Sequence, residues 1–140
     1  MFYKILPGNL CSYGYQYKLG INRMEHPETF GETLLSDDDS YEAGLYFADS
    51  DNILAYCHYG VYIATVEIAD GARLEYWGDG EYSTDALEII NIRPLWDIST
   101  LKELEKEGVD FSADNYAILS WAEELGKTDV VSFLKKHISE

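Results

Sequence analysis

The sequence is poor in basic residues and has no long apolar run, and both shortages exclude classes of partner. Lysine and arginine together number 10, against 26 aspartates and glutamates, so the formal net charge is −16. A field of this sign repels nucleic acid and anionic membranes, and it favours a protein partner with a basic surface. No apolar run approaches the roughly 18 residues that a membrane helix needs. We therefore expect no direct nucleic acid and no membrane among the partners.

Cysteine is also scarce. Cys11 and Cys57 lie far apart and outside any CxxC pair. The chain reaches Pro7 without the extended apolar segment of a secretory signal, so we expect free thiols in a cytoplasmic protein. The three histidines and two cysteines show no metal-ligand spacing, which predicts no metal site.

Recognisable catalytic motifs are missing. The chain contains no P-loop, no GxGxxG and no GxSxG sequence, and on that basis we expect no cofactor. Hydrophobic residues make up 46% of the chain, which is ample for a core. A length of 140 residues predicts one domain, or a domain with a small appendage.

Residues 44–68 are predicted to form a strand, a short helix and a second strand. Leu45 and Phe47 belong to a β-prone run, Ser50 can cap a helix, and Gly60 can end it. Residues 61–68 follow as the segment richest in β-branched residues. We expect this unit at the centre of the fold and as the floor of any chemical site.

The character of the chain changes after Pro94. A capping box at Thr100 predicts one helix, and two more are expected from Asp114 or Asn115 and from Thr128. The order of elements predicts an α+β fold. Residues 1–94 form its β-rich body around the strand–helix–strand unit, and residues 95–140 form a helical tail packed on it.

The last two predicted helices carry small and apolar residues at characteristic positions. These are Ala117, Ala122, Leu125, Gly126, Asp129, Val130, Val131 and Leu134. The pattern resembles an ankyrin repeat, in which small residues let paired helices approach closely and a glycine makes the turn. The resemblance implies an ankyrin-like helical hairpin and a role in protein–protein interaction. A generic helical hairpin is the alternative.

Further short segments extend the resemblance over most of the chain. They are Tyr3-Lys4-Ile5, Gly14-Tyr15-Gln16-Tyr17-Lys18, Gly44-Leu45-Tyr46-Phe47, Tyr59-Gly60-Val61-Tyr62 and Ile89-Ile90. Together with the tail, they look like the amino-terminal region of ankyrin repeat proteins of mimivirus-type giant DNA viruses. This resemblance implies a viral interaction module directed at a host protein.

A shorter resemblance points to chemistry. Residues 44–49, followed by Tyr56, are similar to the nicotinamide-pocket segment of poly(ADP-ribose) polymerases and related ADP-ribosyltransferases. It implies NAD as cofactor, with Tyr46 stacking on nicotinamide and Asp85 or Glu88 orienting the ribose. The first strand carries neither the histidine nor the glycine of that family.

Two features are candidate partner contacts. Like charges in series do not pack together, so Asp37, Asp38 and Asp39 must face water, a cation or a basic partner. Trp121, on a predicted helix, is the second candidate. A non-enzymatic, acidic interaction module is therefore our first hypothesis. The alternatives are an ADP-ribosyltransferase-like enzyme and an acidic mimic of nucleic acid that inhibits a host protein.

Overall fold

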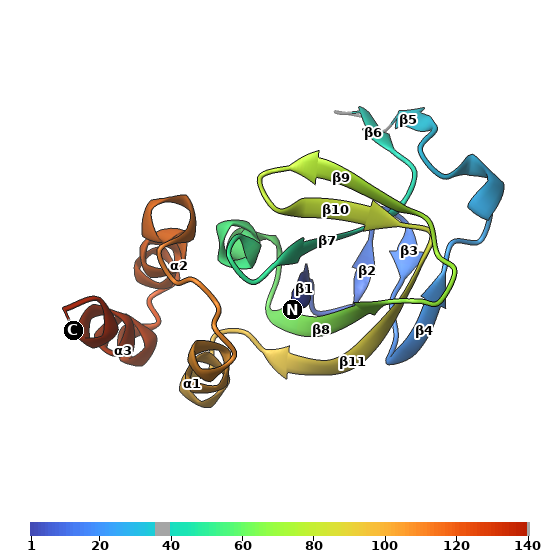
Figure 1. Ribbon diagram of the computed structural model, residues 1–140. Helices are drawn as coiled ribbons and strands as arrows, with labels where there is room; N and C mark the ends of the chain where they lie inside the picture. Colours follow the sequence, from blue (N-terminus) through green and yellow to red (C-terminus); the bar gives the residue numbers. More distant parts are fainter. Residues whose placement is uncertain (36–39, 140) are drawn as a thin grey trace.

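A seven-stranded antiparallel sheet forms most of the molecule, and three helices lie together beyond one end of it (Figure 1). This computed structural model describes residues 1–35 and 40–139. In spatial order the sheet consists of β4 (Gly20–Arg23), β11 (Ala86–Pro94), β8 (Tyr62–Ile68), β1 (Phe2–Leu6), β7 (Leu45–Asp49), β10 (Glu81–Thr84) and β9 (Leu74–Gly78).

Short elements surround this sheet. Two small hairpins pair β2 (Cys11–Ser12) with β3 (Tyr15–Gln16) and β5 (Thr33–Leu35) with β6 (Ser40–Glu42). The helical segments are the 3-10 turns η1 (Pro27–Thr29) and η2 (Ile53–Tyr59), followed by the helices α1 (Ile98–Lys106), α2 (Ala113–Glu124) and α3 (Thr128–Ser139). None of the helices in the described part of the chain is long and apolar enough to cross a membrane.

Side chains alternate across β1 and so join two separate cores. Tyr3 and Ile5 face the helices, where they pack with residues of η2, α1, α2 and α3. Leu6 faces the other way and packs with Phe47 of β7 and with Tyr17, which follows β3. Successive side chains of a strand point to opposite faces, so a strand that is apolar on both faces is buried between two layers. β1 is therefore a central strand of the fold.

The sheet is divided into two halves where β1 meets β7. β1 pairs with β8 along its whole length, but with β7 only through its first two residues. β7 in turn pairs with β10 over four residues. Lys4 reaches across the gap beyond the paired residues, because its Nζ donates a hydrogen bond to the carbonyl oxygen of Tyr46 at 2.6 Å. Beyond the two paired residues, this side-chain hydrogen bond links β1 to β7 in place of backbone hydrogen bonds.

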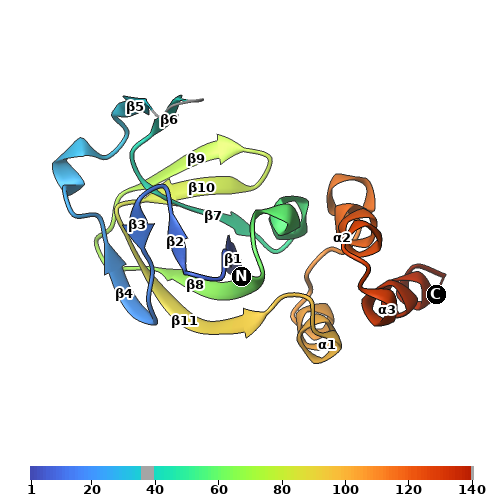
Figure 2. The ribbon, with the colours of Figure 1, turned by 180° about the vertical axis from the view of Figure 1, so that it is seen from behind.

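The helices are held to the sheet by a shared core and by one close backbone approach. η2 lies between the sheet and α2 (Figure 2), and Leu54 of η2 is fully buried in the same cluster as Leu101 of α1 and Ile118 of α2. η2 is followed by Gly60, where an added Cβ would lie 2.1 Å from the carbonyl oxygen of Leu6. Only glycine permits this approach of two chain segments.

The predicted fold class is wrong in its central unit. The sequence predicts residues 44–68 as a strand–helix–strand unit at the centre of an α+β fold, but β1 lies between β7 and β8 and pairs antiparallel with both. The segment between them is a 3-10 helix without a side-chain cap. Local periodicity identifies the two strands, but the insertion of β1 is a pairing of residues far apart in sequence. The result is a seven-stranded antiparallel sheet.

The ankyrin-like helical hairpin is the second correction. Three helices are present in the segment where the sequence predicts them, but the first two do not begin at the predicted caps. α1 begins at Ile98 and not at the capping box of Thr100, because Asp97 is its N-cap and accepts a hydrogen bond from the backbone of Ser99 at 2.9 Å. α2 begins at Ala113. However, three consecutive residues at the start of α2 have left-handed backbone angles, with φ of 52°, 55° and 58°. α2 also packs closely on η2 of the strand-rich body. The tail is not a regular ankyrin unit. The division of the chain after residue 94 stays a prediction.

Candidate functional site

A cavity of about 630 Å³ opens where β1 and β7 part. Its walls come from these two strands, from η2, from the β2–β3 hairpin and from β9 and β10. Six aromatic residues line it: Tyr13, Tyr46, Phe47, Tyr56, Tyr59 and Trp77. A cavity of this size, lined by aromatic side chains together with a few charged groups, is typical of a binding site.

One wall of the cavity is a chain of neighbouring rings. The ring centroid of Tyr46 lies 6.4 Å from that of Trp77 and 6.4 Å from that of Tyr13. Trp77 is fixed in place because its indole Nε1 donates a hydrogen bond to Ser83 Oγ at 2.9 Å. This wall is therefore positioned by packing and by one partly buried hydrogen bond.

A second group of aromatic residues extends from the cavity to α2. The rings of Tyr56 and Tyr59 are stacked, with their centroids 6.1 Å apart, and the centroid of Tyr59 lies 4.2 Å from that of His58. The His58 ring in turn stacks on Trp121 of α2, with a centroid distance of 5.4 Å. We call these four residues the aromatic row. Tyr59 is 58% exposed and Trp121 is 38% exposed. The row thus joins the cavity to the helical part of the molecule and presents aromatic surface to solvent.

Two charged groups lie among these rings. Lys4 is buried, and burial lowers the pKa of its ammonium to about 8, while the charge of Glu81 opposes this effect. Its Nζ also lies 4.7 Å from the centre of the Tyr17 ring. Burial, followed by the Glu81 carboxylate that the Tyr56 hydroxyl contacts, raises the pKa of Tyr56 to about 12. The cavity thus offers a cationic donor and a carboxylate acceptor.

The residues predicted from the ADP-ribosyltransferase resemblance do not all meet. Tyr46 lines the cavity. Asp85 instead forms an ion pair with Arg73 at 3.0 Å and belongs to a separate small depression. Glu88 lies on β11, opposite Ile21 of β4. The carboxylate that the structure brings to the cavity is that of Glu81.

The two predicted partner contacts have different outcomes. Asp37, Asp38 and Asp39 lie outside the described residues. Trp121 is part of the aromatic row, half exposed on α2. In the described part of the chain, no group of three or more His, Cys, Asp or Glu side chains could hold a metal ion.

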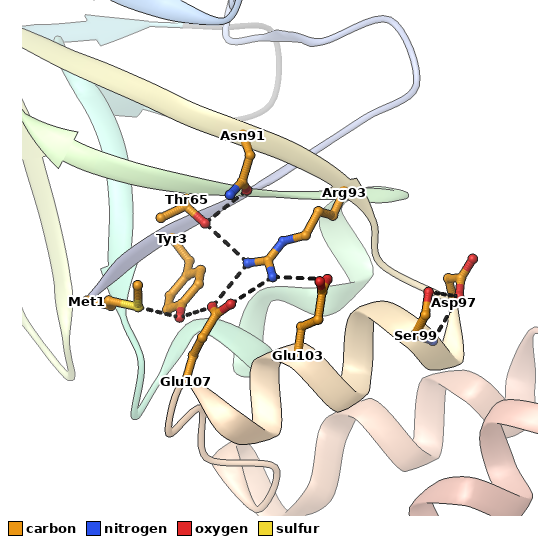
Figure 3. A network of polar contacts seen from close by, with 9 residues as sticks. All are labelled: Met1, Tyr3, Thr65, Asn91, Arg93, Asp97, Ser99, Glu103 and Glu107. Carbon is orange, nitrogen blue, oxygen red and sulfur yellow. Dashed lines mark hydrogen bonds and ion pairs between the residues drawn. The ribbon is translucent and has the colours of Figure 1, made fainter.

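A second polar cluster links α1 to the sheet (Figure 3). Arg93 of β11 donates two hydrogen bonds to Glu107, at 2.8 and 3.1 Å, and one to Thr65 at 3.1 Å. The hydroxyl of Tyr3 donates to the same carboxylate at 2.7 Å, so the Arg93 guanidinium and this bond hold the pKa of Glu107 below its usual value. The cluster fixes α1 to the sheet, and both terminal nitrogens of the Arg93 guanidinium are paired within it, whereas its Nε is buried without a partner among the described residues. We therefore assign it a structural role.

Sequence reasoning missed Lys4, Glu81 and Trp77. Lys4 carried the clearest signal, as a lone charge within an otherwise apolar strand, Phe-Tyr-Lys-Ile-Leu. A buried charge needs a partner, so such a lysine marks a polar site inside the fold. Trp77 lies on β9 and Glu81 at the start of β10. Their position depends on β10 pairing with β7, which is far away in sequence.

The site is thus an aromatic cavity with one basic and one acidic side chain, Lys4 and Glu81, in a strand-rich protein. Comparison with known proteins identifies similar sequences. The chain is similar to two proteins of Acanthamoeba polyphaga mimivirus whose names describe them as ankyrin repeat proteins. Ankyrin repeat protein R229 is 32% identical over 119 residues, which cover 79% of this chain and 36% of that relative. R868 is 23% identical over 141 residues, covering 98% of this chain and 67% of that relative. The chain is therefore related to viral ankyrin repeat proteins.

The extent of these matches is informative. The chain spans about a third of the length of R229 and about two thirds of R868. The helical segment holds only about a third of this chain, so a match over 79% of it must include well over half of the strand-rich body. The relationship therefore does not rest on helices alone. No protein-family model matches the chain, and no solved structure does either.

Proposed function

We propose that this chain is an acidic protein–protein interaction module that binds a partner with a basic surface. The observation that carries the proposal is the aromatic row, which presents Tyr59 and Trp121 to solvent beside the cavity. Aromatic side chains are enriched at the centres of protein interfaces, where they provide large contact areas at low cost in conformational entropy. The relation to ankyrin repeat proteins supports the same function.

Charge favours a basic partner. A net charge of −16 accelerates encounter with positively charged surfaces and disfavours acidic ones. Because both relatives are viral, we propose a protein of the host cell as the partner. The region of Asp37, Asp38 and Asp39 would contribute to this attraction.

Affinity capture from an Acanthamoeba lysate tests the proposal. The immobilised chain should retain the same protein reproducibly, and retention should weaken as salt is raised. Trp121→Ala should lose the partner, whereas Ile21→Ala, on the β4 edge with a similar exposure of 41%, should keep it. Retention that does not depend on Trp121, or no specific retention at all, would contradict the proposal. Asparagine at positions 37–39 tests the acidic-mimic alternative, which predicts complete loss.

An ADP-ribosyltransferase-like enzyme is the second candidate, because Tyr46 lines a cavity of suitable size. The remaining residues do not fit NAD as the resemblance implies. Asp85 is held by Arg73 outside the cavity, and Glu88 lies on β11. No catalytic step follows from this arrangement. The candidate predicts that NAD raises the melting temperature of the wild type and not of Tyr46→Ala, and the absence of any shift would eliminate it.

A further inference from the structure

We propose that the cavity and the aromatic row together form a groove for an extended, proline-rich peptide that carries arginine or lysine. The inference rests on the proposed interaction function and names the chemistry of the partner. It commits to a peptide segment and excludes a small molecule as the main occupant.

The aromatic surface is longer than the cavity. Tyr56 and Tyr59 line the cavity, but the ring contacts continue through His58 to Trp121, which lies outside it on α2. A small molecule would be satisfied by the cavity and would leave the outer half of the row without a ligand. An elongated ligand covers both halves.

The chemistry of the row fits proline. A polyproline II helix has no internal hydrogen bonds, leaves its carbonyl groups free, and presents flat pyrrolidine rings that stack on aromatic side chains. Trp77 of β9 and Tyr59 of η2 belong to two walls of the cavity, and they are 37% and 58% exposed. Proline rings between such walls lose little conformational entropy on binding, because the peptide is already extended.

Lys4 and Glu81 suit the two polar parts of such a peptide. An ammonium group has three N–H donors, and the Tyr46 carbonyl accepts one of them. A peptide carbonyl oxygen is a suitable further acceptor, since it carries no net charge that the acidic protein would repel. Glu81 and Asp79 both act electrostatically on Tyr56, so they place negative charge beside the row. That charge and the net charge of −16 favour arginine or lysine in the ligand.

Fluorescence anisotropy with synthetic peptides tests the groove. The probe is a fluorescein-labelled peptide of about ten residues that alternates prolines with arginines. One comparison peptide keeps the arginines and replaces every proline with alanine, and another keeps the prolines and replaces arginine with glutamate. We expect binding of the first peptide only, with an affinity that falls as salt rises.

Neighbouring residues of β9 provide a matched pair of variants. Trp77 and Tyr76 lie on opposite faces of this strand, with Trp77 against Tyr46 in the cavity and Tyr76 against Tyr82. Trp77→Ala and Tyr59→Ala should each weaken binding about tenfold or more, which corresponds to the loss of one central contact. Tyr76→Ala should bind like the wild type. Thermal melts establish that each variant is folded, and Trp77→Phe serves if Trp77→Ala is not.

Three results would overturn the inference. Equal binding of the alanine peptide would show a general attraction for polycations, and equal loss in Tyr76→Ala would show that the cavity face is not the contact. Absence of binding by the proline–arginine peptide would reject the groove even if a partner is captured from lysate through Trp121. In that last case the interaction function stands and only the peptide chemistry fails.

Discussion

Replacing Lys4 with methionine should stabilise the protein at neutral pH, although it removes a hydrogen bond. The ammonium is buried, and its pKa falls from 10.5 to about 8 in the folded state. Holding a proton on such a group costs the folded state about 3 kcal/mol at pH 7. Methionine has a similar shape and no charge, but the Tyr46 carbonyl loses a partner, which costs about 1 kcal/mol. The expected net gain is about 2 kcal/mol, or about 5 °C in melting temperature.

The pH dependence of this gain has a definite sign. Between about pH 8 and 10.5 the unfolded chain holds more protons on Lys4 than the folded chain does. The stability of the wild type therefore rises with pH in this window, by up to about 1.4 kcal/mol per pH unit. The variant lacks this rise, so its advantage should shrink between pH 7 and pH 9.5. Tyrosines with raised pKa values, such as Tyr56, lower stability at still higher pH in both proteins and cancel in the difference.

Urea unfolding followed by circular dichroism, at pH 7.0 and 9.5, measures both effects. Lys18→Met is the matched control, since Lys18 is exposed, and it should change neither the stability nor its pH dependence appreciably. A Lys4→Met variant less stable than the wild type at pH 7 would refute the reasoning. So would an advantage that stays constant over this pH range, because the buried ammonium would then not be its source.

Three further predictions concern the scaffold. Glu107→Gln should lower the free energy of unfolding by about 2 kcal/mol at pH 7, because it breaks the paired hydrogen bonds with Arg93. Since the pKa of Glu107 is lowered in the folded state, the wild type loses stability when pH falls below the ordinary pKa of a glutamate, and denaturant melts should show a smaller loss for the variant. Cys57 has a pKa raised to about 12 by burial, so Ellman's reagent at pH 8 should label about one thiol in the native chain, and Cys11→Ser should abolish that labelling. Gly60→Ala should destabilise by about 3 kcal/mol in urea titrations, because the new methyl group meets backbone.

The sequence predicts local elements better than it predicts their partners. Residues 61–68 were expected as a strand and form β8 from Tyr62 to Ile68, and a third helix was expected from Thr128, where α3 begins. Caps, glycines and apolar spacing act over a few residues, so they can be read directly. By contrast, the alternation of tyrosines at positions 13, 15 and 17 predicts one strand over residues 13–19, with the three rings on a shared face. These residues contain a turn at Tyr13, which is 61% exposed, whereas Tyr17 is buried in the core.

The candidate site follows the same rule. Tyr46 was expected at the site because it belongs to a contiguous segment with a recognisable pattern, and it lines the cavity. The cavity itself exists because β1 stops pairing with β7 after two residues, which no local pattern encodes. Glu81 reaches it through the pairing of β10 with β7. Asp85, which the resemblance proposed for this role, lies four residues after Glu81 in the sequence. It forms an ion pair with Arg73 and does not line the cavity.

Lys4 connects the stability of the fold to the proposed groove. A buried ammonium that costs about 3 kcal/mol is unfavourable for folding alone, since methionine would fill the same space more stably. The cost has a use if the ammonium donates a hydrogen bond to a peptide carbonyl, because a buried donor that is already held in place binds more strongly than one in water. Lys4→Met should then be more stable and yet bind the proline–arginine peptide more weakly. Exchange of stability for function is common at binding sites. A variant that gains stability and keeps full affinity would separate the two roles and leave Lys4 outside the groove.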